Sequence, residues 1–259
     1  MISKIKSLFQ PTKGDSFIGL IDEDGVGKSS FEGECSMTFG LCAYIKNNNP
    51  VETKEAVVHR KIPNMDYTIK GLEPLTIVEF RGEQIDYHGQ NRINLLSIVK
   101  TESSNAVLEE ILQKRLEPVE FKSEVFGSFI LDRRSHWFET KAQWKNQQIE
   151  LFLSGTLADI RGLESTAIKL FIESDKWDEK IKKKIASDLL SLKNESWIDE
   201  NESPLSEKEF LSKITLESIV IHDEEDFEFW FNDGDIFWGH TISVEGNLNG
   251  HLDKAGIHG

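Results

Sequence analysis

The chain contains few of the residues that cross-link or interrupt a fold. Among its 259 residues are two cysteines, Cys35 and Cys42, with 6 prolines and 18 glycines. Two thiols do not make a disulfide framework. The composition, with 38% hydrophobic and 29% charged residues, excludes a fibrous or disordered chain. The cysteines lie in one predicted strand at an odd spacing, on opposite faces. Because free cysteine is usually interior, we expect both thiols to be buried.

Long apolar stretches are also missing. No window of the sequence approaches the roughly 18 consecutive apolar residues that a membrane-spanning helix needs. The segment MISKIKSLFQPTKG at residues 1–14 holds no apolar stretch of signal-peptide length. We therefore expect a soluble, cytoplasmic protein without a membrane partner.

Recognised catalytic and cofactor-binding motifs are absent as well. The sequence has no Cys-x-x-Cys, His-Glu-x-x-His or Gly-x-Ser-x-Gly pattern. Residues 25–29 resemble the end of a phosphate-binding loop, but Asp22 replaces the first glycine and a strand is predicted where the motif needs a helix. We interpret these residues as a glycine turn. We expect no cofactor, and binding rather than catalysis, although an active site can leave no local pattern.

Positive charge is scarce, with 30 Lys and Arg against 45 Asp and Glu and a net charge of −15. A field of this sign repels nucleic-acid phosphates, so we do not expect nucleic acid as a partner; it favours basic proteins, basic peptides or cations. The shortage is greatest over residues 214–253, which contain no Lys or Arg, ten Asp or Glu and six Phe or Trp. This stretch is either a sheet with a crowded core and a negative rim or a surface that binds a positive partner.

The composition changes near residue 120. All three tyrosines lie before this point and all six tryptophans after it. The first 120 residues hold 14 basic and 18 acidic side chains, a net of −4, and the rest hold 16 and 27, a net of −11. We therefore expect two domains, residues 1–118 and 119–259, with a boundary at Glu117 and Pro118.

The first half is rich in predicted strands. Apolar or β-branched runs, separated by Gly, Asn and Pro, cover residues 17–21, 35–45, 56–60, 75–81 and 92–100. Helical spacing follows over residues 107–115, with Ser103 or Ser104 as the cap. Five short strands predict a small β-barrel that resembles an OB-type barrel by analogy.

The second half predicts an α+β domain, an antiparallel sheet with two to three helices packed on it. Strands are expected over residues 126–131, 137–144, 148–153, 215–221, 226–231 and 236–244. Two helices lie between them, one with Ile160, Leu163, Ala167 and Leu170 on one face, the other capped by Asp175 with Trp177, Ile181, Ile185 and Leu189 on one face. A capping box at residues 206–209 opens a third helix.

The last two predicted strands form an acidic and aromatic hairpin. Phe227, Phe229 and Phe231 alternate with polar residues or Trp230, which places the three rings on one face. An Asp-Gly pair within residues 232–235 is a strong hairpin turn, and in the return strand the side chains at 236, 238, 240, 242 and 244 share a face. A recognition or metal site here would use Trp230, Asp233, Asp235, Trp238 and His240. The alternative is a plain hairpin with solvated acids and a core histidine.

A second candidate site lies at a strand junction. Arg133, Arg134 and His136 precede Trp137, and two arginines with a histidine can grip a carboxylate or phosphate. The alternative is an ordinary turn, because turns gather polar residues.

From about residue 126 to the end, the chain resembles the bacterial domain of unknown function family 2262. The segments that carry the resemblance are FILDRR at 129–134, WFE at 137–139, DKWD at 175–178, LKNESW at 192–197, ITLESI at 214–219 and DGDIFWGH at 233–240. The family has no assigned activity. The resemblance therefore implies a soluble bacterial protein and transfers no catalytic residue.

Three functional hypotheses follow from the sequence. The leading one is a non-enzymatic module, like an inhibitor or immunity protein, whose acidic and aromatic sheet binds a basic protein. The second is a metal-assisted hydrolase that uses Asp233, Asp235 and His240. The third is oligonucleotide binding by the N-terminal barrel. The sequence predicts neither the oligomeric state nor the identity of a partner.

Overall fold

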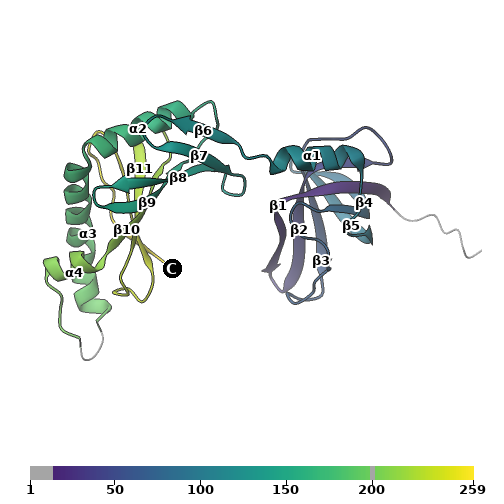
Figure 1. Ribbon diagram of the computed structural model, residues 1–259. Helices are drawn as coiled ribbons and strands as arrows, with labels where there is room; N and C mark the ends of the chain where they lie inside the picture. The colour runs from purple at the N-terminus through teal and green to yellow at the C-terminus, as the bar shows by residue number, and fades with distance from the viewer. Residues whose placement is uncertain (1–13, 199–201) are drawn as a thin grey trace, which may run out of the picture. The chain divides into compact units, whose positions relative to one another are not determined.

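The computed structural model describes residues 14–198 and 202–259, and the chain divides into two compact units, up to Glu117 and from Pro118 (Figure 1). The segment for which the sequence predicts no signal peptide falls almost entirely within residues 1–13, outside the described residues. Within the two described ranges, no helix is long and apolar enough to cross a membrane.

The first unit is a sheet of five strands that closes on itself in the order β1-β2-β3-β5-β4. β1 pairs with both β2 and β4, and this double pairing closes the ring. Neighbouring strands are antiparallel except β3 and β5, which are parallel. The strands are β1 (Asp15–Phe31), β2 (Glu34–Lys46), β3 (Ala56–Ile62), β4 (Ile77–Tyr87) and β5 (Gln90–Lys100). All five predicted strands are present.

Aromatic rings fill the ring of strands. Phe17 stacks on Phe80 with ring centroids 5.2 Å apart, and Phe39 meets Phe80 edge-on at 6.3 Å. The predicted glycine turn at residues 25–29 is wrong, because these residues continue strand β1. A bulge accommodates them: Gly25 has a φ of +67°, and its amide donates to the Asp22 carboxylate at 3.3 Å.

Helix α1 (Ala106–Leu116) completes the first unit. Its cap is Asn105, whose side chain accepts from the amides of Val107 and Leu108, rather than the predicted Ser103 or Ser104. Near its other end, Arg115 makes a bidentate ion pair with Glu23 of β1, with Nε 3.0 Å from Oε1 and Nη2 2.7 Å from Oε2.

The two thiols differ in environment. Cys42 is buried beneath α1, as expected, and its neighbours in this small core include Leu20 and Leu108. Cys35 is only half-buried, so the expectation that both thiols are interior is wrong for it. Cys35 lies at the start of β2 beside the Phe31–Glu34 turn, where its sulfur contacts the Ser30 hydroxyl at 3.7 Å. Both cysteines are free.

The second unit is an open sheet of eight strands in the order β13-β12-β11-β10-β9-β8-β7-β6. The strands are β6 (Glu120–Ser123), β7 (Gly127–Asp132), β8 (Trp137–Trp144), β9 (Gln147–Leu153), β10 (Thr215–Ile221), β11 (Asp226–Asn232), β12 (Thr241–Asn247) and β13 (Gly256–His258). The predicted α+β class is confirmed, but the sheet is not wholly antiparallel. β9 and β10 run parallel, because the helices between them in sequence form a crossover connection.

That crossover consists of α2 (Ile160–Ile172), α3 (Ser174–Ser196) and α4 (Glu207–Lys213), and Figure 1 shows α2 and α3 beside the strands of the sheet. The predicted apolar faces of the first two helices are buried in one core with the inward side chains of the strands. α3 begins at Ser174, one residue before the predicted cap Asp175. The predicted capping box of α4, Ser206 with Glu209, is confirmed.

The last hairpin differs from its prediction. Phe227, Phe229 and Phe231 share the core face of β11, each about 1% exposed, as expected. The return strand, however, begins at Thr241 and not at residue 236. Residues 233–240 form a loop, hereafter the 233–240 loop, in which Gly234, Asp235, Trp238 and Gly239 all have positive φ.

Candidate functional site

Asp233 holds the 233–240 loop together. Its side chain is 2% exposed. One carboxylate oxygen accepts from the Asp235 amide at 3.0 Å, and the other accepts from the amides of Phe237 and Gly239 at 2.7 and 3.3 Å. Three backbone donors satisfy this buried charge. Asp233 is therefore a structural residue of the loop. The solvated acid expected in a plain hairpin is wrong at this position, and a direct contact between Asp233 and a partner stays a prediction.

Trp238 is the exposed aromatic side chain of this loop. Its φ is +58°, in the left-handed region that bulky residues rarely adopt, yet the side chain is 60% exposed. The indole lies 4.7 Å from the ring of Trp197, at the C-terminal end of α3. Trp197 also meets Phe237 edge-on at 5.5 Å. Two of the segments that carry the family resemblance, 192–197 and 233–240, thus meet at Trp197.

His240 and Trp230 each lie near the last strand, β13. His240 is half-buried, packs edge-on against Trp197 at 5.3 Å, and lies against Gly259. Its Nδ1 is buried without a hydrogen-bond partner among the described residues. Trp230 points to the opposite face of β11 from the core phenylalanines and lies 5.0 Å from the ring of His258. Trp197 therefore brings together two of the five predicted residues, Trp238 and His240, whereas Trp230 contacts His258 of β13.

The ten acidic residues of segment 214–253 do not form one patch. Asp223, Glu224, Glu225 and Asp226 lie at or before the start of β11, whereas Asp235 follows its end. Seven residues of strand at ~3.3 Å each separate these ends by about 20 Å. Asp235 remains exposed beside Trp238, and Glu217 accepts a hydrogen bond from Asn232 at 3.1 Å at the same end of β11.

The sheet face opposite the helices carries a polar network that the sequence does not indicate. Glu228 is buried there, 3.2 Å from Nε2 of His222. Burial raises the pKa of Glu228, but hydrogen bonds from His222, Ser243 and Trp230 outweigh it and hold the pKa below 4.5. The hydrogen bond to Glu228 in turn raises the pKa of His222 above 6.5, against burial.

Ser243 and His258 resemble a nucleophile and its base, with the hydroxyl oxygen 2.9 Å from Nε2. Which of these two atoms donates depends on the tautomer of His258. Ser243 is only 5% exposed. The pair is structural, and no local sequence signal marks residues 15 apart as partners.

Metal-ligand geometry is likewise not found at the predicted residues. In the part of the chain that the structure describes, no three His, Cys, Asp or Glu side chains are grouped as metal ligands. Asp233 uses both carboxylate oxygens on backbone amides. The metal-assisted hydrolase gains no support from this geometry.

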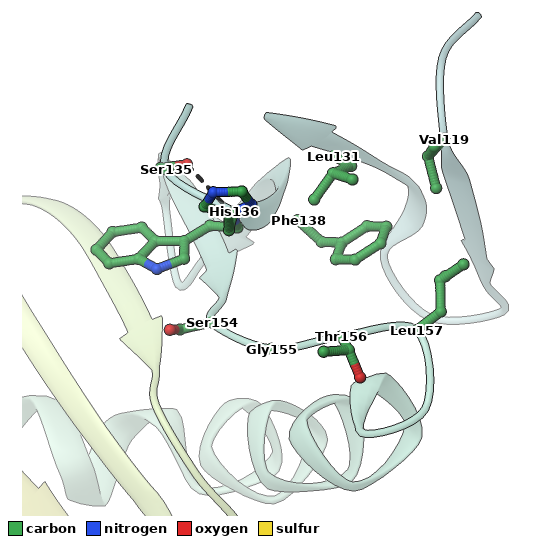
Figure 2. A pocket seen from close by; sticks show the side chains of 10 residues that line it. Val119, Leu131, Ser135, His136, Phe138, Ser154, Gly155, Thr156 and Leu157 are labelled. Carbon is green, nitrogen blue, oxygen red and sulfur yellow. Dashed lines mark hydrogen bonds between the residues drawn. The ribbon is translucent and has the colours of Figure 1, made fainter. Parts of the chain in front are cut away.

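The second predicted site, Arg133, Arg134 and His136, lies in the turn between β7 and β8. Asp132 closes the turn by accepting from the Arg134 amide at 2.9 Å and from the Ser135 hydroxyl at 3.0 Å. The first of these bonds is the main cause of a lowered pKa at Asp132. His136 lines the cavity shown in Figure 2, and Arg133 and Arg134 are not among the residues that line this cavity.

Comparisons with known family models match one family to each of the two compact units of the chain. The model of the family described as "Uncharacterized protein conserved in bacteria (DUF2262)" matches residues 123–257, which confirms the resemblance found in the sequence. The model described as "Domain of unknown function (DUF7021)" matches residues 1–115. No curated protein and no solved structure matches the chain.

Proposed function

The chain belongs to the family of uncharacterized proteins conserved in bacteria (DUF2262), and from the geometry of its second unit we propose that it binds a basic protein through Trp238 and the 233–240 loop. In this proposal the chain is not an enzyme but an interaction module, in the manner of an inhibitor or immunity protein. The cytoplasmic location expected from the sequence stays a prediction.

The observation that carries the proposal is the state of Trp238. A left-handed backbone costs a non-glycine residue roughly 1–2 kcal/mol, and an indole that is 60% exposed recovers little of this by burial. Glycine would fit the same position without strain. An exposed tryptophan in a strained backbone conformation therefore lowers the stability of the fold, and a binding role explains its presence.

The loop also presents Trp238 in a fixed position. The Asp233 carboxylate accepts hydrogen bonds from three amides of the loop. The ring of Trp197 packs against the indole of Trp238. A side chain ordered before binding loses less conformational entropy when a partner arrives. Tryptophan is among the residues that most often supply the binding energy of protein interfaces.

Charge indicates the kind of partner. The chain has a net charge of −15, and Asp235, three residues from Trp238, is exposed. A negative field speeds the encounter with a positive protein and discriminates against acidic ones. A basic protein with an apolar pocket for the indole fits both features.

Co-purification with the tagged full-length chain from bacterial lysate tests this proposal. We expect a net-basic protein to co-purify with the wild type and to be lost with Trp238→Gly. This variant should fold, because relief of roughly 1–2 kcal/mol of backbone strain offsets the loss of the Trp197 contact, about 0.5–1.5 kcal/mol. Asp235→Asn should weaken binding most at low salt.

The matched control is Ile172→Ala, which removes another exposed apolar side chain of the second unit, 78% exposed. It should retain the partner. The proposal is wrong if Trp238→Gly, shown to be folded by circular dichroism, retains the same proteins as the wild type, or if both variants lose them equally.

For the first unit we propose the OB arrangement. The support is the strand order β1-β2-β3-β5-β4, closed through the two pairings of a long, bulged β1, with β3 and β5 parallel. Fold alone assigns no ligand, so oligonucleotide binding by this unit stays a prediction.

A further inference from the structure

A cavity of about 610 Å³ lies at the end of the second unit's sheet, away from the 233–240 loop in sequence (Figure 2). It is bounded by the β7–β8 turn and by the segment that leads from β9 into α2. Apolar side chains form most of its wall: Val119, Leu131, Trp137, Phe138 and Leu157. This volume lies within the range of pockets that hold small molecules, roughly 300–1,000 Å³.

The polar groups at the cavity fall into two classes. The hydroxyls of Ser135 and Thr156 are already used, because they donate to Asp132 at 3.0 Å and to Asp159 at 2.6 Å. The His136 ring, by contrast, forms no hydrogen bond with another residue in the described part of the chain. The Ser154 hydroxyl points away from this ring (Figure 2), so His136 is the group that a ligand can use.

His136 has the same backbone feature as Trp238. Its φ is +59° and the residue is exposed, so it occupies the left-handed last position of a hairpin turn where glycine or asparagine fits without strain. The His136 backbone is strained in the conformation that places its ring at the cavity. Backbone strain is concentrated at functional sites, so a strained residue in a cavity wall suggests that the cavity binds a ligand.

We propose that this cavity binds a small apolar carboxylate, whose body lies against the apolar wall and whose acid group accepts a hydrogen bond from the His136 ring. An acceptor suits this group, because an imidazole N–H donates, and a hydrogen bond to an ionised carboxylate is stronger than one between two neutral groups. The site is separate from the proposed partner-binding loop.

Isothermal titration calorimetry with decanoate, 1-decanol and decylamine on the full-length protein tests the proposal. The three probes share one alkyl chain and differ in the head group. We expect decanoate to bind with a dissociation constant below about 1 mM, decanol more weakly, and decylamine most weakly. His136→Gly should weaken decanoate binding about tenfold or more and leave decanol unchanged.

The control is His88→Gly, since His88 is a second histidine with left-handed backbone, at φ +54° in the first unit. It should leave all three probes unaffected. Leu157→Glu, which places a charge in the wall, should abolish decanoate binding; Leu157 is 56% exposed, so this variant keeps the fold. The proposal is overturned if the wild type does not bind decanoate, if decylamine binds as tightly, or if His136→Gly binds decanoate like the wild type.

Discussion

At the scale of single residues, Asp233 shows how a carboxylate can be misread from the sequence. An Asp-Gly pair between two strands favours a two-residue turn with solvated acids. The structure instead buries Asp233 and uses it to order eight residues of loop. The sequence gives no sign of this, because the three amides that bind the carboxylate depend on the path of the loop and not on its residue types.

Replacement of Asp233 by asparagine tests this structural role. One carboxylate oxygen becomes an NH₂ group that faces an N–H donor, so we expect a loss of about 1–3 kcal/mol in the free energy of unfolding, measured by urea denaturation. Asp235→Asn is the matched control. Its carboxylate is exposed, so the change should stay within about 0.5 kcal/mol. Equal effects of the two variants would refute the role given to Asp233.

The two free thiols make a second test at the residue scale. Burial raises the pKa of Cys42 to about 11, even though Arg115 lies near enough to lower it. Thiolate is the reactive form, and Cys35 is half-buried at a strand end. At pH 8 we expect Ellman's reagent to modify Cys35 readily and Cys42 only after unfolding. Two equally fast thiols in the folded protein would contradict this, and Cys35→Ser identifies which thiol reacts.

At the scale of elements, the network of His222, Glu228 and Ser243 joins the end of β10 to β11 and β12. Its pH dependence has a definite sign. The pKa of His222 is raised above 6.5, so its stabilisation is complete below pH 6.5 and is lost as pH rises through the folded value. The pKa of Glu228 is lowered below 4.5, so its stabilisation is complete above pH 4.5 and is lost as pH falls through the folded value. The network contributes most between pH 4.5 and 6.5.

Urea unfolding of the wild type and His222→Gln at pH 5.5 and pH 8.5 measures this contribution. We expect the free energy of unfolding to fall more in the wild type than in the variant as pH rises from 5.5 to 8.5, because only the wild type has an imidazole at position 222 that loses its proton. Asp226 and Glu245 also raise the pKa of His222 and remain in both proteins. The account of the network fails if both proteins show the same dependence on pH.

Most elements were predictable from sequence because their signals are local. Alternating phenylalanines marked β11, and apolar residues at helical spacing marked α2 and α3. Strand pairing was not predictable in the same way. The parallel pair β9–β10 joins strands that are separated by three helices, and its register depends on how the helices cover the sheet. Side-chain partners such as Ser243 and His258 depend on that pairing.

At the scale of the whole molecule, the sequence identified the negative charge but not its distribution. The acidic residues of segment 214–253 are spread over the sheet: Asp223 to Asp226 lie at or before the start of β11, Glu228 is buried within it, and Asp235 follows its end. The 233–240 loop instead presents one exposed tryptophan, Trp238, which packs against Trp197 at the end of α3. Trp238 was named from the sequence, whereas its strain and its support are visible only in the fold.

Site-specific photo-crosslinking tests the central claim most directly. With Trp238 replaced by benzoylphenylalanine in the full-length protein, we predict one dominant adduct, with a protein that has more Lys and Arg than Asp and Glu. Its yield should fall as ionic strength rises. The same substitution at Ile172, exposed elsewhere in the second unit, should not give this adduct. An adduct that forms equally from both positions, an acidic captured protein, or no adduct at position 238 would contradict the claim.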